Sequence, residues 1–129
     1  MIYELATDWV NALRNGNFQQ GKNFLNRDNE FCCLGVLCEV AGIEKKESLD
    51  NLGFTYYGND TYLSKKIQGI VGFKDDEGKI RFSSYDVEYM KKNFNIIINE
   101  NFYSLAYLND AGVPFDHIAD IIEKYWMEL

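Results

Sequence analysis

The sequence predicts a compact α+β domain, mainly helical with a few short strands, that spans residues 1–129 as a single domain. A chain of 129 residues can bury one core without disulfides or metals. Apolar residues make up 47% of the chain and aromatic residues 16%, which argues against a disordered adaptor. The clearest patterns recur at helical spacing, whereas the strand-like runs are short.

An amphipathic helix is predicted at the start of the chain, because apolar side chains recur there at four-residue spacing. The stripe consists of Ile2, Leu5, Trp9, Ala12 and Leu13. Asn15–Gly16 is predicted to end this helix, since both residue types adopt the left-handed geometry of helix ends. Residues 17–30 are polar and are predicted to form a loop, with one turn of structure around Phe24 and Leu25.

The block Phe31–Cys38 is the most informative stretch, because it holds all three cysteines among apolar residues and a glycine. A nucleophile, a metal site and a packed core segment could each have this composition. We predict an extended entry at Phe31–Cys32 and a buried helix over about 34–41 that Gly42 ends. Packing is the favoured interpretation, since free cysteine behaves as a small hydrophobic residue and an odd number of cysteines suits a reducing compartment.

The remaining elements are predicted from shorter patterns. Residues 44–62 are rich in turn residues and are predicted to form a loop. We next predict a short helix capped by Ser64 that carries Ile67, Ile70 and Val71, followed by a lone strand at Ile80–Phe82. A helix capped by Ser84 follows, with Val87, Met90 and Phe94 inward, and then a strand over Ile96–Ile98 and a short helix over Phe102–Leu108. The final helix is predicted to begin at Pro114 and to carry the stripe Phe115, Ile118, Ala119, Ile122 and Trp126.

Charge and hydropathy argue against several classes of function. The chain carries 20 acidic and 13 basic side chains, for a net charge of −7, which disfavours direct nucleic-acid binding. No apolar run approaches membrane-spanning length, and the N-terminus lacks the basic and apolar regions of a signal peptide. We therefore expect no membrane association and a cytoplasmic location.

No catalytic, metal-binding or cofactor-binding pattern stands out. A catalytic cysteine needs a base, and His117, the single histidine, is predicted on the flank of the last helix. Cys32, Cys33 and Cys38 do not form the Cys-x-x-Cys pair that is typical of zinc sites. Phosphate-binding glycine loops, dinucleotide fingerprints and nucleophile elbows are missing from the sequence. We assign no catalytic residue, metal or cofactor, although a Cys–His pair stays open because such partners need not be sequence neighbours.

Three cations precede the predicted buried helix, namely Arg14, Lys22 and Arg27. The free N–H groups at the start of a helix form a natural anion site when cations lie nearby. A small anionic ligand, such as a nucleotide derivative, would fit there. Alternatively, these cations pair with local acids such as Asp28 and Glu30.

Two motifs stand out near the two ends of the chain. The first is Trp9-x-x-Ala12-Leu13-Arg14-x-Gly16-x-x-x-Gln20-Gly21, then Leu25 and the block Phe31–Cys38, and the second is Leu108-Asn109-Asp110-x-Gly112-x-x-Phe115-x-x-Ile118-Ala119-x-x-Ile122-Glu123. These motifs resemble a family of small, mostly uncharacterised proteins from phages and prophages. Packing explains their apolar members, so their polar members Arg14, Gln20, Asn109 and Asp110 become candidates for ligand contact. Lys22 and Arg27 complete this candidate ligand-binding set.

The resemblance implies a role in counter-defence against the host. We expect a non-catalytic binding protein that sequesters a small anionic, nucleotide-derived immune signal in the cytosol of the host cell. One alternative is an acidic protein inhibitor of a host effector, whose negative surface imitates nucleic acid, and another is a Cys-dependent enzyme. The partner would be a small anionic ligand or a host protein, and a homodimer is left open.

Overall fold

The computed structural model describes residues 1–96 and 102–129 and confirms the predicted fold class, a mainly helical α+β domain. Its helices are α1 (Tyr3–Arg14), α2 (Cys33–Val40), α3 (Lys65–Val71), α4 (Ser84–Phe94), α5 (Leu105–Asp110), α6 (Phe115–Tyr125) and the short 3-10 helix η1 (Trp126–Glu128). Its strands are β1 (Gln19–Gln20), β2 (Glu30–Phe31), β3 (Lys45–Glu47), β4 (Phe54–Tyr56), β5 (Lys79–Arg81) and β6 (Phe102–Ser104). Within the described residues, β1 pairs with β2 in parallel, whereas β3 with β4 and β5 with β6 are antiparallel.

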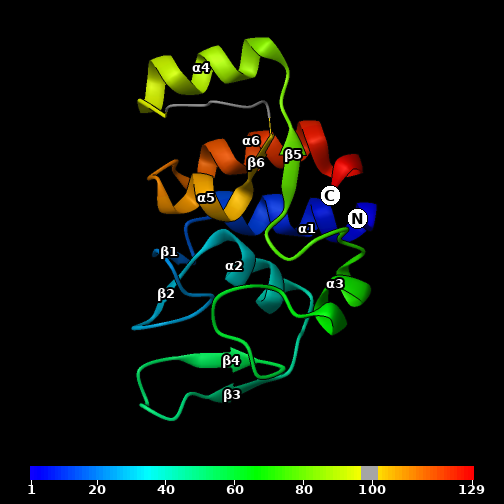
Figure 1. Cartoon of the computed structure of the whole chain (residues 1–129). Coiled ribbons are helices and arrows are strands. Elements are labelled where there is room, and N and C mark those ends of the chain that lie inside the picture. The colour runs from blue at the N-terminus through cyan, green and yellow to red at the C-terminus, as the bar shows by residue number, and fades with distance from the viewer. Residues whose placement is uncertain (97–101) are drawn as a thin grey trace.

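The helices stack in layers, as Figure 1 shows. α1 packs against α6 on one side and against α2 on the other, and α5 contacts both α2 and α6. α4 lies at one end of the molecule, beyond α6, and the β3–β4 hairpin lies at the other end. The two termini meet, because the amino group of Met1 donates a hydrogen bond to the Leu129 carbonyl at 3.0 Å. None of the helices in the described residues has both the length and the apolar character that a bilayer span requires.

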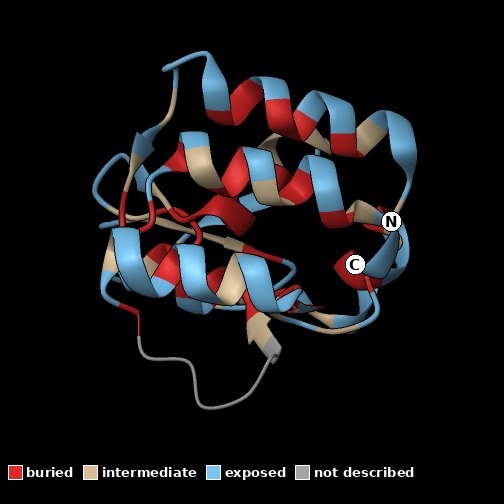
Figure 2. Cartoon of the chain, turned by 90° about the horizontal axis from the view of Figure 1, so that it is seen from above, coloured by how far each residue is buried: buried red, intermediate tan, exposed pale blue. Residues whose placement is uncertain are grey.

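The cysteine helix α2 lies at the centre of the core, which confirms the packing interpretation of this block. Buried residues gather on the inner faces of the helices (Figure 2), and the three cysteines are all buried. The indole Nε1 of the fully buried Trp9 donates a hydrogen bond to the Cys33 carbonyl at 2.8 Å, which ties α1 to the start of α2. Gly35 lies so close to the neighbouring segment that a Cβ there would come within 1.6 Å of the Leu25 carbonyl oxygen. The apolar helix and its glycine therefore belong to one close-packed arrangement.

The helix patterns are largely confirmed at residue level. α1 ends at Arg14 and α2 ends at Val40, each within one residue of the predicted limit. Ser64 caps α3, since its hydroxyl accepts a hydrogen bond from the backbone N–H of Ile67. Two caps shift by one position, because Ser83 rather than Ser84 caps α4 and Pro114 is the N-cap of α6 instead of its first helical residue. At the end of the last stripe, Tyr125 is buried in place of Trp126.

Three predictions about strands are wrong. Residues 44–62 do not form a plain loop, because β3 and β4 pair there as a hairpin with Lys45 opposite Tyr56. The strand near Ile80 is not alone, since it pairs with β6, which occupies the first part of the helix predicted over Phe102–Leu108. The predicted loop over 17–30 contributes β1 and the start of β2. The strand predicted over Ile96–Ile98 lies partly outside the described residues.

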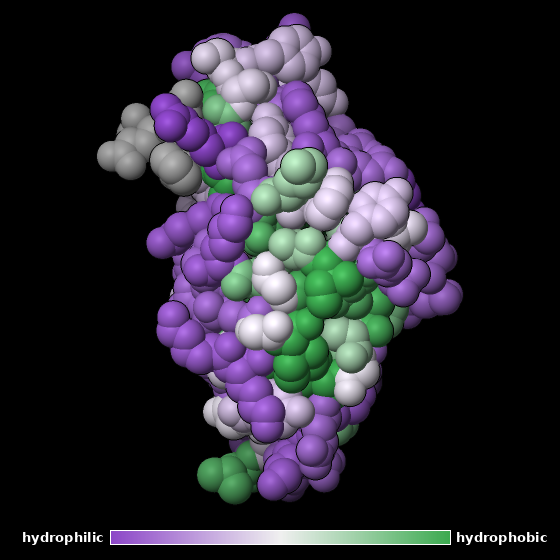
Figure 3. Space-filling view, turned by 90° about the vertical axis from the view of Figure 1, so that its right-hand side faces the viewer, coloured by the Kyte–Doolittle hydropathy of each residue, from purple (hydrophilic) through white to green (hydrophobic). Residues whose placement is uncertain are grey.

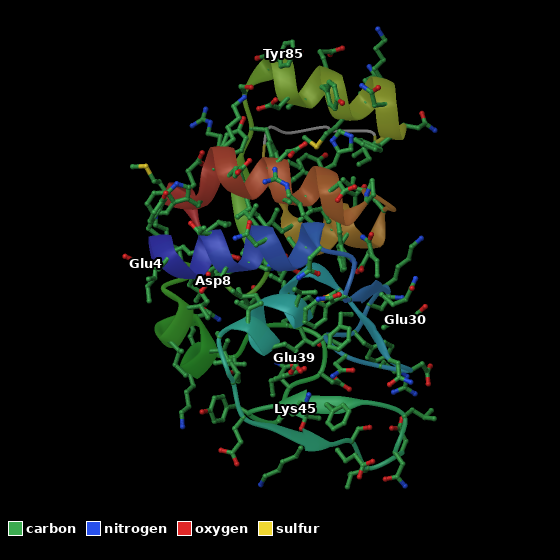
Figure 4. The ribbon with its side chains drawn as sticks, turned by 180° about the vertical axis from the view of Figure 1, so that it is seen from behind. Glu4, Asp8, Glu30, Glu39, Lys45 and Tyr85 are labelled. Carbon is green, nitrogen blue, oxygen red and sulfur yellow. The ribbon has the colours of Figure 1, made fainter. Side chains whose placement is uncertain are left out.

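The hairpin is attached to the end of α2 by a polar cluster. Glu39 on α2 accepts hydrogen bonds from Lys45 Nζ at 2.7 Å and from the Tyr56 hydroxyl at 2.8 Å, and Figure 4 shows Glu39 above Lys45. The Asn26 amide donates to the same hydroxyl at 3.1 Å. Tyr56 is fully buried, and this burial raises the pKa of its hydroxyl. These groups satisfy one another and hold the hairpin on the core.

Candidate functional site

Asn109 lies at the centre of a buried hydrogen-bond network that joins both motifs. Its Oδ1 accepts from the Cys33 backbone N–H at 3.2 Å and from Gln20 Nε2 at 3.0 Å. Its Nδ2 donates to the Gly21 carbonyl at 2.8 Å and to Asp110 Oδ1 at 3.2 Å. Asn109 is fully buried, so its amide holds three chain segments together inside the protein.

Gln20 extends this network to the start of α6. Its Nε2 also donates to the Val113 carbonyl at 2.9 Å, and its Oε1 accepts from the Phe115 backbone N–H at 3.1 Å. Asp110 Oδ1 accepts in addition from the backbone N–H of Asn23 at 2.9 Å. The structure therefore brings Gln20, Asn109 and Asp110 together, and each of them makes hydrogen bonds within the protein.

The cations of the candidate set lie elsewhere. Arg14 bridges α1 to α6, with Nη2 at 2.5 Å from Asp120 and at 2.8 Å from Glu123. The hydrogen bonds to Glu123 and Asp120 raise the pKa of Arg14, and the bond from Arg14 lowers the pKa of Glu123. Local pairing was expected with Asp28 and Glu30, but Arg14 uses these two acids on α6 instead.

Lys22 and Arg27 share a shallow depression that is also lined by Gly21, Phe24, Asp28 and Glu30. Arg27 pairs with Asp50 at 2.9 Å, and its guanidinium lies 4.7 Å from the centre of the Phe24 ring. Hydrogen bonds from Ser48 and from the Leu52 backbone, followed by that from Arg27, lower the pKa of Asp50 to about 2. The first N–H of α2, that of Cys33, donates to Asn109 Oδ1 and is not available to an anion, so the structure does not assemble the predicted anion site as one unit.

The thiols are placed for packing. Burial raises the pKa of Cys32 to about 11 and raises that of Cys33 and Cys38 as well. The Cys33 thiol donates to the Leu105 carbonyl at 3.6 Å, whereas the rings next to His117 are those of Tyr89 and Phe94. No group of three or more histidine, cysteine or acidic side chains among the described residues could hold a metal ion.

We expect the native protein to leave its three thiols unreactive toward a disulfide-exchange reagent at pH 8, and to expose all three in urea. Because the folded-state pKa of Cys32 is about 11 and its ordinary value is 9.0, Cys32 keeps its proton in the folded state and loses it in the unfolded state between about pH 9 and pH 11. The buried, protonated thiol therefore contributes to the free energy of unfolding below about pH 9, and this contribution is lost as the pH rises toward 11. Rapid labelling of one thiol in the native protein would instead place that thiol in an open crevice.

A pocket between α4 and α6 is the feature that the sequence did not reveal. Its volume is about 200 Å³. Its lining residues are Tyr85, Asp86, Tyr89, Met90, Phe94, His117, Asp120, Ile121, Lys124 and Tyr125. The His117 ring meets the Phe94 ring edge-on at a centroid distance of 4.8 Å and the Tyr89 ring at 5.7 Å. An aromatic wall with a few polar side chains is typical of small-molecule sites.

Asp86 fastens the first turn of α4 to α6. Its Oδ2 accepts from Lys124 Nζ at 2.6 Å, from the Ser83 hydroxyl at 3.0 Å and from the Tyr125 hydroxyl. Burial raises the pKa of Asp86, but the hydrogen bonds from Lys124, Tyr125 and Ser83 outweigh that effect and lower it. This cluster links the two helices, and Asp86, Lys124 and Tyr125 also line the pocket.

The chain matches a known protein family over nearly its whole length. A family model described as "Domain of unknown function (DUF8296)" matches residues 1–126. The chain belongs to this family. No curated protein and no solved structure matches the chain significantly. The family match thus covers both motifs and the α4–α6 pocket, and assigns no activity to either of them.

The DUF8296 chain carries one sequence signal for its pocket. Tyr85 and Tyr89 follow each other at helical spacing in α4 and stay exposed, and Tyr85 lies at the outer edge of the helix (Figure 4). Met90 of α4 is buried, and Val87 and Phe94, which were also predicted to point inward, are partly buried and pack against the core. Both tyrosines belong to the lining of the α4–α6 pocket.

Proposed function

We propose that this DUF8296 protein is a non-catalytic binding protein that sequesters a small nucleotide-derived molecule in the α4–α6 pocket. The observation that carries the proposal is the aromatic wall formed by Tyr89, Phe94 and His117 beside the polar side chains of Asp86 and Asp120. Rings of this kind stack on nucleobases, and side-chain oxygens next to them orient a bound ring.

Binding without chemistry is supported by the state of the possible nucleophiles. The cysteines are buried, and their raised pKa keeps them as thiols, which are poor nucleophiles. His117 lines the α4–α6 pocket and contacts aromatic rings there. A Cys-dependent enzyme needs a thiol and a base within hydrogen-bond reach of each other, and these positions do not favour it.

The role that we favour is counter-defence, in which a phage protein traps an immune signal in the cytosol of the host cell. This part rests on the resemblance of the two motifs to small phage and prophage proteins. A binding protein needs no catalytic residue for this role, because one pocket per molecule removes one signal molecule from circulation. Nucleotide-derived signals carry both a base and phosphate, so the ligand class stays compatible with the anionic ligand expected from the sequence.

An acidic inhibitor of a host protein is the second candidate, and one surface favours it. Figure 3 shows apolar side chains gathered on the face that carries α3 and the termini, where Ile2, Ile70 and Met127 are exposed. Glu4 and Asp8 of α1 lie on the same side of the molecule (Figure 4). An apolar patch edged by carboxylates suits a partner with a basic rim.

Native mass spectrometry after exposure to nucleotide extracts of the host tests the proposal. We expect the wild-type chain to retain an adduct that is released unchanged, and we expect Tyr89→Ala to lose the adduct because the aromatic wall is broken. Tyr62→Ala is the matched control, since Tyr62 is exposed to a similar degree and does not line the pocket. A released ligand of altered mass would establish turnover and overturn the proposal. The lack of any adduct would also overturn it and favour a protein partner.

A further inference from the structure

The α4–α6 pocket has a size that limits what can enter it. Its volume of about 200 Å³ is small beside the roughly 300–1,000 Å³ of pockets that enclose drug-sized ligands. The rings of the aromatic wall do not share one plane, since the planes of His117 and Phe94 cross at 77° and those of His117 and Tyr89 at 49°. The pocket therefore has room for one flat ring system and not for a whole nucleotide.

Carboxylates outnumber ammonium groups among the residues that line the pocket. Two carboxylates, Asp86 and Asp120, face one ammonium group, Lys124, and that ammonium is already paired with Asp86 at 2.6 Å. A phosphate would meet more negative than positive charge here, so the lining disfavours it. Arg14 is bound to Asp120 and Glu123 on α6 and does not line the pocket.

Two carboxylate oxygens remain as acceptors. Three donors converge on Asp86 Oδ2, and Arg14 binds Asp120 Oδ1. No donor from residues 1–96 or 102–129 forms a hydrogen bond with Asp86 Oδ1 or Asp120 Oδ2, and His117 Nδ1 lies 4.0 Å from the latter. A ligand that presents N–H groups would donate a hydrogen bond to each of these oxygens.

We infer that the α4–α6 pocket recognises the N–H-bearing ring of a nitrogen heterocycle, such as a nucleobase, and leaves any attached phosphate outside. This inference rests on the proposed function and names the part of the ligand that enters the site. The ring stacks on one ring of the aromatic wall, meets the tilted neighbouring ring at its edge, and donates a hydrogen bond to Asp120 Oδ2. Among the residues that line the pocket, half-exposed Lys124 supplies the ammonium group.

Calorimetric titration with adenosine, guanosine, cytidine and their 5′-monophosphates tests this inference. We expect at least one nucleoside to bind, its monophosphate to bind with an affinity within about threefold, and inorganic phosphate not to compete, because the phosphate contributes little. Asp120→Asn should weaken binding about tenfold or more, since it replaces one acceptor oxygen by a donor. Glu123→Gln is the matched control, because Glu123 also pairs with Arg14 but does not line the pocket, and it should bind as the wild type does.

Two results would overturn the inference and leave the proposed function standing. The first is a monophosphate that binds more than about tenfold tighter than its nucleoside and is displaced by inorganic phosphate, since the anion would then be the recognised group. The second is no binding of any nucleoside or monophosphate while the extract ligand still forms its adduct. Failure of the extract ligand itself to bind would instead contradict the proposed function. Unchanged thermal unfolding of Asp120→Asn excludes misfolding as the cause of lost binding.

Discussion

Asn109→Ala is expected to lower the free energy of unfolding by about 3 kcal/mol or more, because it leaves several buried polar groups without a partner. The Cys33 N–H, the Gly21 carbonyl and one Gln20 N–H would lose hydrogen bonds in a fully buried site. Water cannot replace these bonds unless the segments separate. Urea denaturation followed by circular dichroism measures the loss.

Lys22→Ala is the matched control for this prediction. Lys22 belongs to the same candidate set, but its side chain is exposed, so we expect a change within about 0.5 kcal/mol. Equal stability of Asn109→Ala and the wild type would show that the network does not hold the segments together. Asn109 would then become available for a ligand, as the sequence predicted.

Gly35→Ala is expected to have the second large effect and to destabilise the protein by about 3 kcal/mol or more. The added Cβ would come within 1.6 Å of the Leu25 carbonyl oxygen and 2.5 Å of its carbon, which are backbone atoms that cannot rotate away. α2 and the Leu25 segment would have to separate, and the buried cysteine helix would lose its close packing. The midpoint of urea unfolding measures the effect, and the yield of soluble protein provides a second readout.

Gly69→Ala serves as the control for the effect of alanine itself. Gly69 lies within α3, and a Cβ there would meet nothing within 4 Å, so the helix gains propensity and stability should rise by up to about 1 kcal/mol. If Gly35→Ala unfolded at the same urea concentration as the wild type, the close approach of α2 to the Leu25 segment would be contradicted.

Local periodicity explains which parts of the fold were predictable. The stripes of α1 and α6 and the apolar cysteine block depend on residues three or four positions apart, so the sequence alone reveals them. The β3–β4 hairpin was missed because Lys45–Glu47 is exposed throughout and shows no alternation. β6 was missed because its partner, β5, lies more than 20 residues earlier, and pairing over that separation leaves no local signature.

The candidate site was predictable only as a set of residue types. The motifs made Gln20 and Asn109 candidates for ligand contact, and in the structure these two side chains bond to each other across 89 residues of sequence. A sequence cannot distinguish a polar side chain that binds a ligand from one that binds another segment, because both need the same donors and acceptors. The α4–α6 pocket depends on how two helices pack, so no local pattern in the sequence indicates that Asp86 and Asp120 line the same pocket.

Amide NMR titration with the nucleoside that binds most tightly tests the central claim most directly, because it locates the ligand on the folded chain. If the motif residues hold the core and the pocket binds the ligand, the shifted signals will belong to α4 and α6, including Tyr89, His117 and Asp120. Shifts confined to Lys22, Asn23 and Arg27, with none in α4 or α6, would contradict the account and return the ligand to the site that the sequence predicted.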